Sequence, residues 1–142
     1  MTGNVTRAAG IPSIGEMLAP PTVTGTRFTN IVGGYKRIGG KVYVDIFAKI
    51  NFDMSVVTPP AINGYDTGLK NFPQTYAKAI QSLTCDIVKR DNTNDRYTGY
   101  SQGIAYMYQD ASGVTNLGFG TYTALVASDN CYAHIFGAYD AA

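Results

Sequence analysis

The sequence predicts an all-β protein, an antiparallel β-sandwich or jelly-roll-like domain. From residue 27 onward, short runs rich in Val, Ile, Thr, Tyr and Phe alternate with clusters of Gly, Asn, Asp and Pro, at intervals of roughly ten to fifteen residues. No stretch of about ten or more residues carries a helical stripe with caps, and the connections are too short for helical crossovers. This pattern favours short antiparallel strands packed face to face.

The chain has two expected parts, an N-terminal arm and one β-domain. Residues 1–26 contain glycines and prolines that interrupt every periodic run, so we expect an extended or flexible arm with at most a short turn of helix from Ser13. Residues 27–142 are expected to form the sandwich head. A chain of 142 residues with 45% apolar content is long enough to bury a single core.

The first two strands are expected to form a hairpin. A strand over residues 29–38 meets a second over residues 41–52 across the pair Gly39 and Gly40. Two consecutive glycines suit a two-residue primed turn in which both positions adopt positive φ.

The second strand of this hairpin has two different faces. Its even-numbered side chains are apolar and define a core face: Val42, Val44, Ile46, Ala48, Ile50 and Phe52. The odd-numbered side chains are Tyr43, Asp45, Phe47, Lys49 and Asn51. This second face is too aromatic for ordinary wet surface and too charged for a core. Either another subunit or the chain's own N-terminal segment is expected to cover Tyr43 and Phe47.

The remaining strands follow a long connection over residues 53–79, which contains a short edge strand near residues 55–57. A strand over residues 79–90 places Leu83, Cys85 and Ile87 on one face. Two further strands, within residues 102–109 and 117–127, flank the turn at 110–113, and residues 131–139 close the sheet. We expect Cys85 and Cys131 to be buried free thiols unless their strands are neighbours.

The order of these elements resembles a known family. The segments "IGGKVYVDIFAKI" and "GLKNFPQTYAKA", with the step Phe72–Pro73 in the second, are similar to the C-terminal head domain of phage and prophage tail-fibre or baseplate receptor-binding proteins. The resemblance covers residues 29–140, and it departs from the family pattern where a second proline is missing after Pro73. It implies a virion structural protein at the tail tip, assembled in the host cytoplasm.

The resemblance also implies a homotrimer that contacts other tail or virion proteins and binds a saccharide or protein on the host cell surface. The trimer would place Tyr43 and Phe47 on a neighbouring protomer, and Asp45 and Lys49 at the interface or its rim. Two other classes stay open from the sequence. One is a capsid or decoration protein with an N-terminal arm, and the other is a bacterial lectin or adhesin.

Composition excludes two kinds of partner. Charged residues make up only 15% of the chain, the formal net charge is +1, and no block of lysine or arginine is longer than the pair Lys36 and Arg37. We therefore expect neither nucleic-acid binding nor attraction to an anionic membrane. Neither a secretory signal nor a membrane-spanning run is found in the sequence, so folding in a cytosol is expected.

Catalytic and metal motifs are also missing from the sequence. His134 is the single histidine, and no serine lies in a G-x-S-x-G motif or an equivalent that would make it a nucleophile for a catalytic triad. We therefore expect a structural role for His134 and no enzymatic activity. Asp91 and Asp95 would occupy positions 1 and 5 of a calcium loop, but Arg96 stands where glycine is required and Gln102 where glutamate is required. We expect a solvated hairpin tip there, with no metal and no cofactor.

The candidate binding residues are tyrosines and polar side chains in two connections. They are Tyr65 and Asp66 in one, and Asn94, Arg96, Tyr97 and Tyr100 in the other. Aromatic rings offer flat faces to the C–H surface of a sugar, and the polar groups can bond its hydroxyls. The alternative is that part of this set packs on the ends of the sandwich.

Overall fold

The computed structural model describes residues 18–55, 64–76, 78 and 80–142. The turn of helix expected from Ser13 and most of the edge strand expected at residues 55–57 fall outside these residues, and Ser55 itself is in no strand. At this point Met54 makes a single antiparallel bridge to Leu125.

The fold is all-β, as the sequence predicts. In the described part of the chain, eight strands and one short 3-10 helix follow in order: β1 (Thr22–Val23), β2 (Phe28–Ile38), β3 (Lys41–Ile50), β4 (Tyr65–Phe72), β5 (Gln81–Asp91), β6 (Arg96–Gln109), β7 (Thr115–Thr121), η2 (Ala127–Asp129) and β8 (Cys131–Asp140). They form one antiparallel sheet in the order β1-β4-β7-β6-β5-β8-β3-β2.

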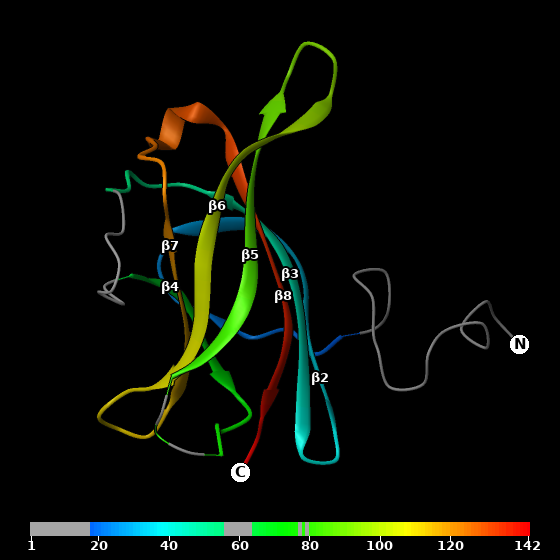
Figure 1. Ribbon diagram of the computed structural model, residues 1–142, viewed down its shortest axis with the longest axis vertical. Coiled ribbons are helices and arrows are strands. Elements are labelled where there is room, and N and C mark those ends of the chain that lie inside the picture. The colour runs from blue at the N-terminus through cyan, green and yellow to red at the C-terminus, as the bar shows by residue number, and fades with distance from the viewer. Residues whose placement is uncertain (1–17, 56–63, 77, 79) are drawn as a thin grey trace, which may run out of the picture.

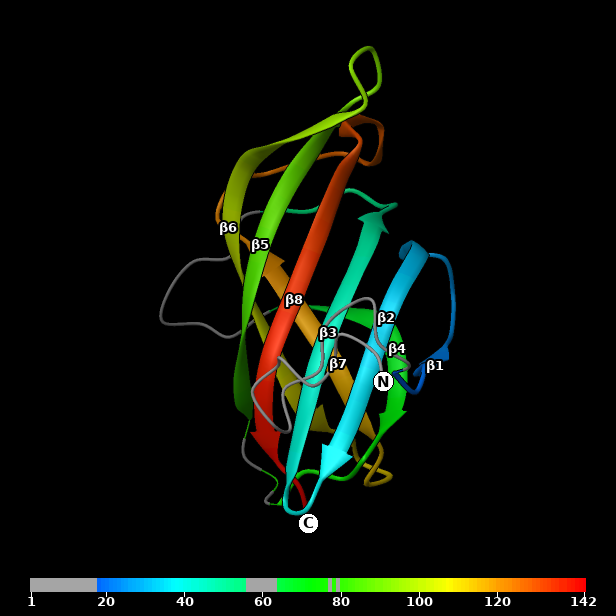
Figure 2. The same cartoon turned by 90° about the vertical axis from the view of Figure 1, so that its right-hand side faces the viewer.

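The sheet curls on itself, so that its two halves face each other like the layers of a sandwich. Strands β5, β8, β3 and β2 form one wall and β4, β7 and β6 the other (Figures 1 and 2). Apolar side chains from both walls fill the space between them, with Ile46, Ile50, Leu69, Met107 and Ile135 fully buried. This core fixes which side of each strand faces solvent.

The β2–β3 hairpin is confirmed, but its turn differs from the prediction. Gly39 has φ of 60°, whereas Gly40 is not among the residues with positive φ. One positive φ, at the first central position, is the pattern of a type II′ turn rather than the type with two. The second glycine is therefore not required by backbone sterics.

The two-faced character of β3 is confirmed. Its even-numbered side chains from Val42 to Ile50 are all buried, while Tyr43, Asp45, Phe47 and Lys49 are only partly covered. Phe52 lies just beyond the strand and still packs against the core. A one-residue register shift would exchange these faces, so the core fixes the register.

Strand β4 was missed, because the sequence reads there as a loop. Two residues in it have positive φ, Gly68 at 82° and Asn71 at 61°, and the pairing with β7 shifts at two places. These irregularities break the two-residue period on which strand prediction depends. Strand β6 also begins earlier than expected, at Arg96.

The described part of the N-terminal segment joins the two ends of the sheet. Ala19 and Tyr35 of β2 exchange backbone hydrogen bonds of 2.9 and 3.0 Å, and β1 pairs with β4. Glycines make room for this segment: a Cβ on Gly34 would lie 2.1 Å from the Ala19 carbonyl oxygen, and one on Gly68 would lie 2.0 Å from that of Thr24. We call residues 18–24 the closing strap.

Candidate functional site

Strands β3 and β8 lie side by side and present a continuous surface, which faces the viewer in Figure 2. Their pairing sets Asp45 opposite Phe136, Phe47 opposite His134 and Lys49 opposite Tyr132. We define this outer face by the outward side chains of the two strands: Tyr43, Asp45, Phe47, Lys49, Tyr132, His134 and Phe136. It contains all four residues predicted for a subunit interface.

Aromatic rings are in mutual contact over the upper part of the outer face. Phe47 stacks on Tyr132 with ring centroids 5.2 Å apart, and Tyr97 meets both rings edge-on at 5.4 and 5.3 Å. Tyr97 comes from β6 and keeps 46% of its surface exposed, and Val32, the cross-strand neighbour of Phe47 on β2, keeps 50%. The described residues therefore leave a contiguous apolar patch open.

A polar pair lies beside these rings. The Nε2 atom of His134 is 2.9 Å from Oδ1 of Asp45, and the Asp45 side chain is only 17% exposed. Asp86 on β5 is the direct cross-strand neighbour of His134. In this geometry His134 is a hydrogen-bond partner for the largely buried carboxylate of Asp45.

The lower part of the outer face is hollowed. A depression of about 320 Å³ is lined by Tyr43, Val44, Asp45, His134, Phe136, Gly137 and Ala138. It is apolar apart from the Asp45–His134 pair on its wall. Such a hollow accepts an apolar side chain better than a polyhydroxylated ligand.

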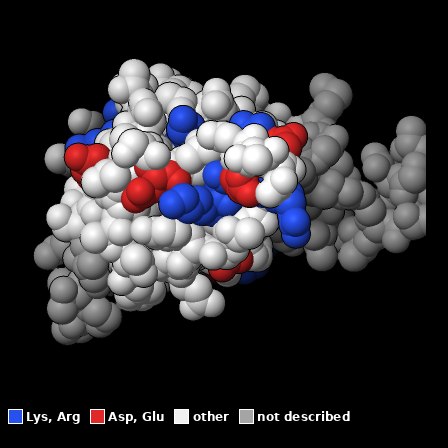
Figure 3. All heavy atoms as spheres, turned by 90° about the horizontal axis from the view of Figure 1, so that it is seen from above, with Lys and Arg blue, Asp and Glu red and all other residues white. Residues whose placement is uncertain are grey.

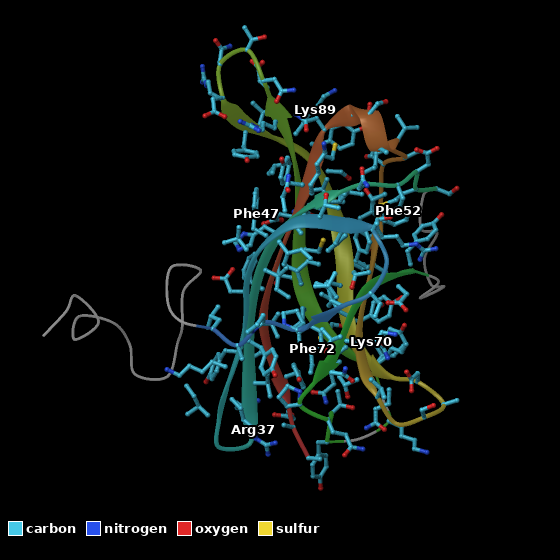
Figure 4. All side chains as sticks on the ribbon, turned by 180° about the vertical axis from the view of Figure 1, so that it is seen from behind. Arg37, Phe47, Phe52, Lys70, Phe72 and Lys89 are labelled. Carbon is cyan, nitrogen blue, oxygen red and sulfur yellow. The ribbon has the colours of Figure 1, made fainter. Side chains whose placement is uncertain are left out.

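Tyr65 and Asp66, two of the predicted ligand residues, lie on a different part of the surface. The ring of Tyr65 meets that of Phe52 at 5.2 Å, and the Arg27 guanidinium lies over both rings. Figure 4 shows Phe52 on the opposite side of the molecule from Phe47. This cluster and the outer face are therefore separate.

The other predicted ligand residues do not converge. The Asn94 side-chain amide donates to the Asp91 carboxylate at 2.9 Å in the exposed β5–β6 hairpin tip. Arg96 is the cross-strand neighbour of Asp91 in the backbone register of this hairpin. Tyr97 joins the outer face, whereas the Tyr100 hydroxyl donates to the Ala124 carbonyl at 3.1 Å. Seen from this end, basic and acidic groups are interspersed (Figure 3).

The hairpin tip is a self-contained turn. Asp91 accepts a hydrogen bond from the Thr93 amide at 2.9 Å, and this bond with that of Asn94 lowers the pKa of the Asp91 carboxyl. Asp95 has φ of 52° and pairs with Arg90. Within the described part of the chain, no three His, Cys, Asp or Glu side chains gather closely enough to hold a metal ion.

Sequence reasoning missed Arg27 and the contribution of β8. Tyr132, His134 and Phe136 alternate in the sequence, which shows that they share a face, but the sequence does not show that β8 lies beside β3. Arg27 meets rings that are distant in the chain, and no local signal marks it. Helices long and apolar enough to cross a membrane do not occur among the described residues.

Three comparisons with known proteins were made. Neither models of protein families, nor curated proteins, nor solved structures gave a match to this chain.

Proposed function

We propose that this protein is a non-enzymatic head domain that forms a homotrimer and binds a saccharide or protein on a host cell surface, as a part of a phage tail fibre. The observation that carries the proposal is the outer face. Tyr97 and Val32 keep about half of their surface exposed and Phe47 is partly exposed, around the buried ring of Tyr132.

Self-association is the use that this patch favours. Aromatic side chains contribute large apolar areas to interfaces, and apolar burial contributes roughly 25 cal/mol per Å². Lys49 and the Asp45–His134 pair lie among the rings, where polar groups of an interface fix orientation more than they add affinity. The tail-fibre resemblance supplies the number of copies, three, and the host-surface partner.

The decisive experiment is a measurement of oligomeric state with variants of the two faces of β3. By size-exclusion chromatography with light scattering, we expect the native chain to be a closed trimer. Phe47→Asp places a charge in the aromatic patch, so we expect it to give folded monomers. A monomeric native chain would overturn the trimeric head, whereas large shells or sheets would favour a capsid or decoration protein.

Val44→Asp is the matched control, because Val44 lies three positions away on the buried face. An unpaired carboxylate in the core costs on the order of 4 kcal/mol or more, so this variant should unfold the protomer. Circular dichroism separates the two results. Equal loss of folded protein in both variants would show that the assignment of Phe47 to an outer face, separate from the core, is wrong. A glycan array on the native trimer then tests host-surface binding, and a monomer that binds glycans would be a lectin or adhesin.

A further inference from the structure

A second depression lies where the closing strap runs into β2. It has a volume of about 370 Å³ and is lined by Thr24, Gly25, Thr26, Arg27, Asp66 and Gly68. Gly25 in its wall has a φ of 74°, a left-handed conformation that favours glycine. Arg27 in its wall lies over the Phe52 ring, and Figure 4 shows Phe52 on the opposite side of the molecule from Phe47 of the outer face.

Arg27 is held in place by three contacts. Its guanidinium carbon is 5.0 Å from the centre of the Phe52 ring and 5.8 Å from that of Tyr65, and Nη1 donates to the Asp66 carbonyl at 3.0 Å. A guanidinium has five N–H groups, so most of them remain for a ligand. Binding usually costs side-chain entropy when a free arginine is immobilised, and these contacts already restrict Arg27 before a ligand binds.

The charge of Arg27 is not neutralised by an ion pair among the described residues. The nearby carboxylate of Asp66 is engaged elsewhere, because its Oδ1 accepts a hydrogen bond from the Gly68 amide at 2.9 Å. An oriented guanidinium without a carboxylate partner, at the wall of an open depression, is suited to an anion.

We propose that this depression binds a saccharide that carries a carboxylate, with Arg27 as the residue that contacts the carboxylate. A planar carboxylate matches the fork of a guanidinium. Asp66 lies close enough to disfavour a doubly charged phosphate, and its remaining acceptor sites suit sugar hydroxyls, as do those of Thr24 and Thr26. This inference rests on the proposed function for the kind of ligand, and it names the site and the ligand class.

The test compares two probes on the full chain, D-glucuronate and D-glucose, which differ by the carboxylate. In a titration followed by amide chemical shifts, we expect glucuronate to move the amides of residues 24–27 and 66–68, and glucose to bind at least tenfold more weakly. Arg27→Gln should weaken glucuronate at least tenfold. Lys89→Gln removes the same charge from the exposed end of β5 and should leave binding unchanged.

Arg27→Lys keeps the charge without the fork, so it should bind with an intermediate loss and shows whether geometry matters. It also replaces Arg27→Gln if that variant fails to fold. Equal binding of glucose and glucuronate, shifts located elsewhere, or tighter binding of inorganic phosphate would overturn the proposal. If the protein is a trimer that does not bind glucuronate, the proposed site is wrong and the trimeric head is not contradicted. If it is a monomer that binds glucuronate, the trimeric head is wrong and the proposed site is not contradicted.

Discussion

At the scale of single residues, burial decides the chemistry available to the side chains. Cys85 and Cys131 are both free and buried, as expected from the sequence, and they lie on neighbouring strands, β5 and β8. Cys85 is opposite Ile135, four positions along β8 from Cys131, so the two thiols are offset along the strands. Burial raises the pKa of Cys85 to about 12 and also raises that of Cys131.

We therefore predict that neither thiol reacts in the folded protein at neutral pH, since the thiolate is the reactive form. Ellman's reagent should label no cysteine in the native protein and both cysteines in denaturant. The exposed variant Ser82→Cys, on β5, provides a positive control for reagent access. Rapid labelling of Cys85 or Cys131 without denaturant would contradict the burial described.

At the scale of elements, the closing strap provides backbone hydrogen-bond partners for two strands at the ends of the sheet. The strap supplies backbone partners to β2 at Tyr35 and to β4 over residues 69–70. Strand edges left unpaired are prone to aggregation, so this closure protects both ends of the sheet. Gly34 is required for the closure because a Cβ there would collide with the Ala19 backbone, although its φ is not positive. Gly68 is required both because a Cβ would collide with the Thr24 backbone and because its φ is positive.

We predict that Gly34→Ala destabilises the protein by about 1–3 kcal/mol, because its Cβ would meet the Ala19 backbone and displace the strap. Chemical denaturation measures this, and faster hydrogen exchange of the Tyr35 amide, which donates to Ala19, would locate it. Gly99→Ala on β6 is the control, since nothing lies within 4 Å of its Cβ position. An unchanged unfolding free energy for Gly34→Ala would show that the strap is not tightly docked.

At the scale of the whole molecule, several tyrosine hydroxyls have higher pKa values in the folded protein than they would have in water. Burial raises the pKa of Tyr108 to about 12, and it also raises the pKa values of Tyr106 and Tyr139 above the usual 10.0. The Tyr139 hydroxyl donates to the Pro73 carbonyl at 2.6 Å, which joins β8 to the end of β4. The step Phe72–Pro73 thus contributes a buried ring and a partly buried acceptor to the closed fold.

We predict that stability falls as the pH rises from about 9 to about 12. In that window the unfolded chain has already lost protons that the folded protein still holds on Cys85 and these tyrosines, so ionisation favours unfolding. The denaturation midpoint should decrease steadily, and tyrosinate absorbance should show a late-ionising class that disappears in denaturant. A midpoint independent of pH over this range would contradict the prediction.

The sequence by itself determined the strands with regular alternation, the β2–β3 hairpin and the core face of β3. Those features depend on residues close together in the chain, where a period of two and a pair of glycines act directly. It also placed Phe47 and Tyr43 on the opposite face. It failed at β4, where positive φ at Gly68 and Asn71 removes the period.

Only the tertiary structure decided which strands are neighbours. It brought Asp45 to His134, 89 residues further along the chain, placed Tyr97 on Phe47, and set Arg27 between two rings and a depression. It also separated Tyr65 and Asp66 from Tyr97 and Tyr100, which the sequence offered as one binding set. The reason is physical: strand order and sheet curvature follow from burial of the whole core, and no local pattern encodes them.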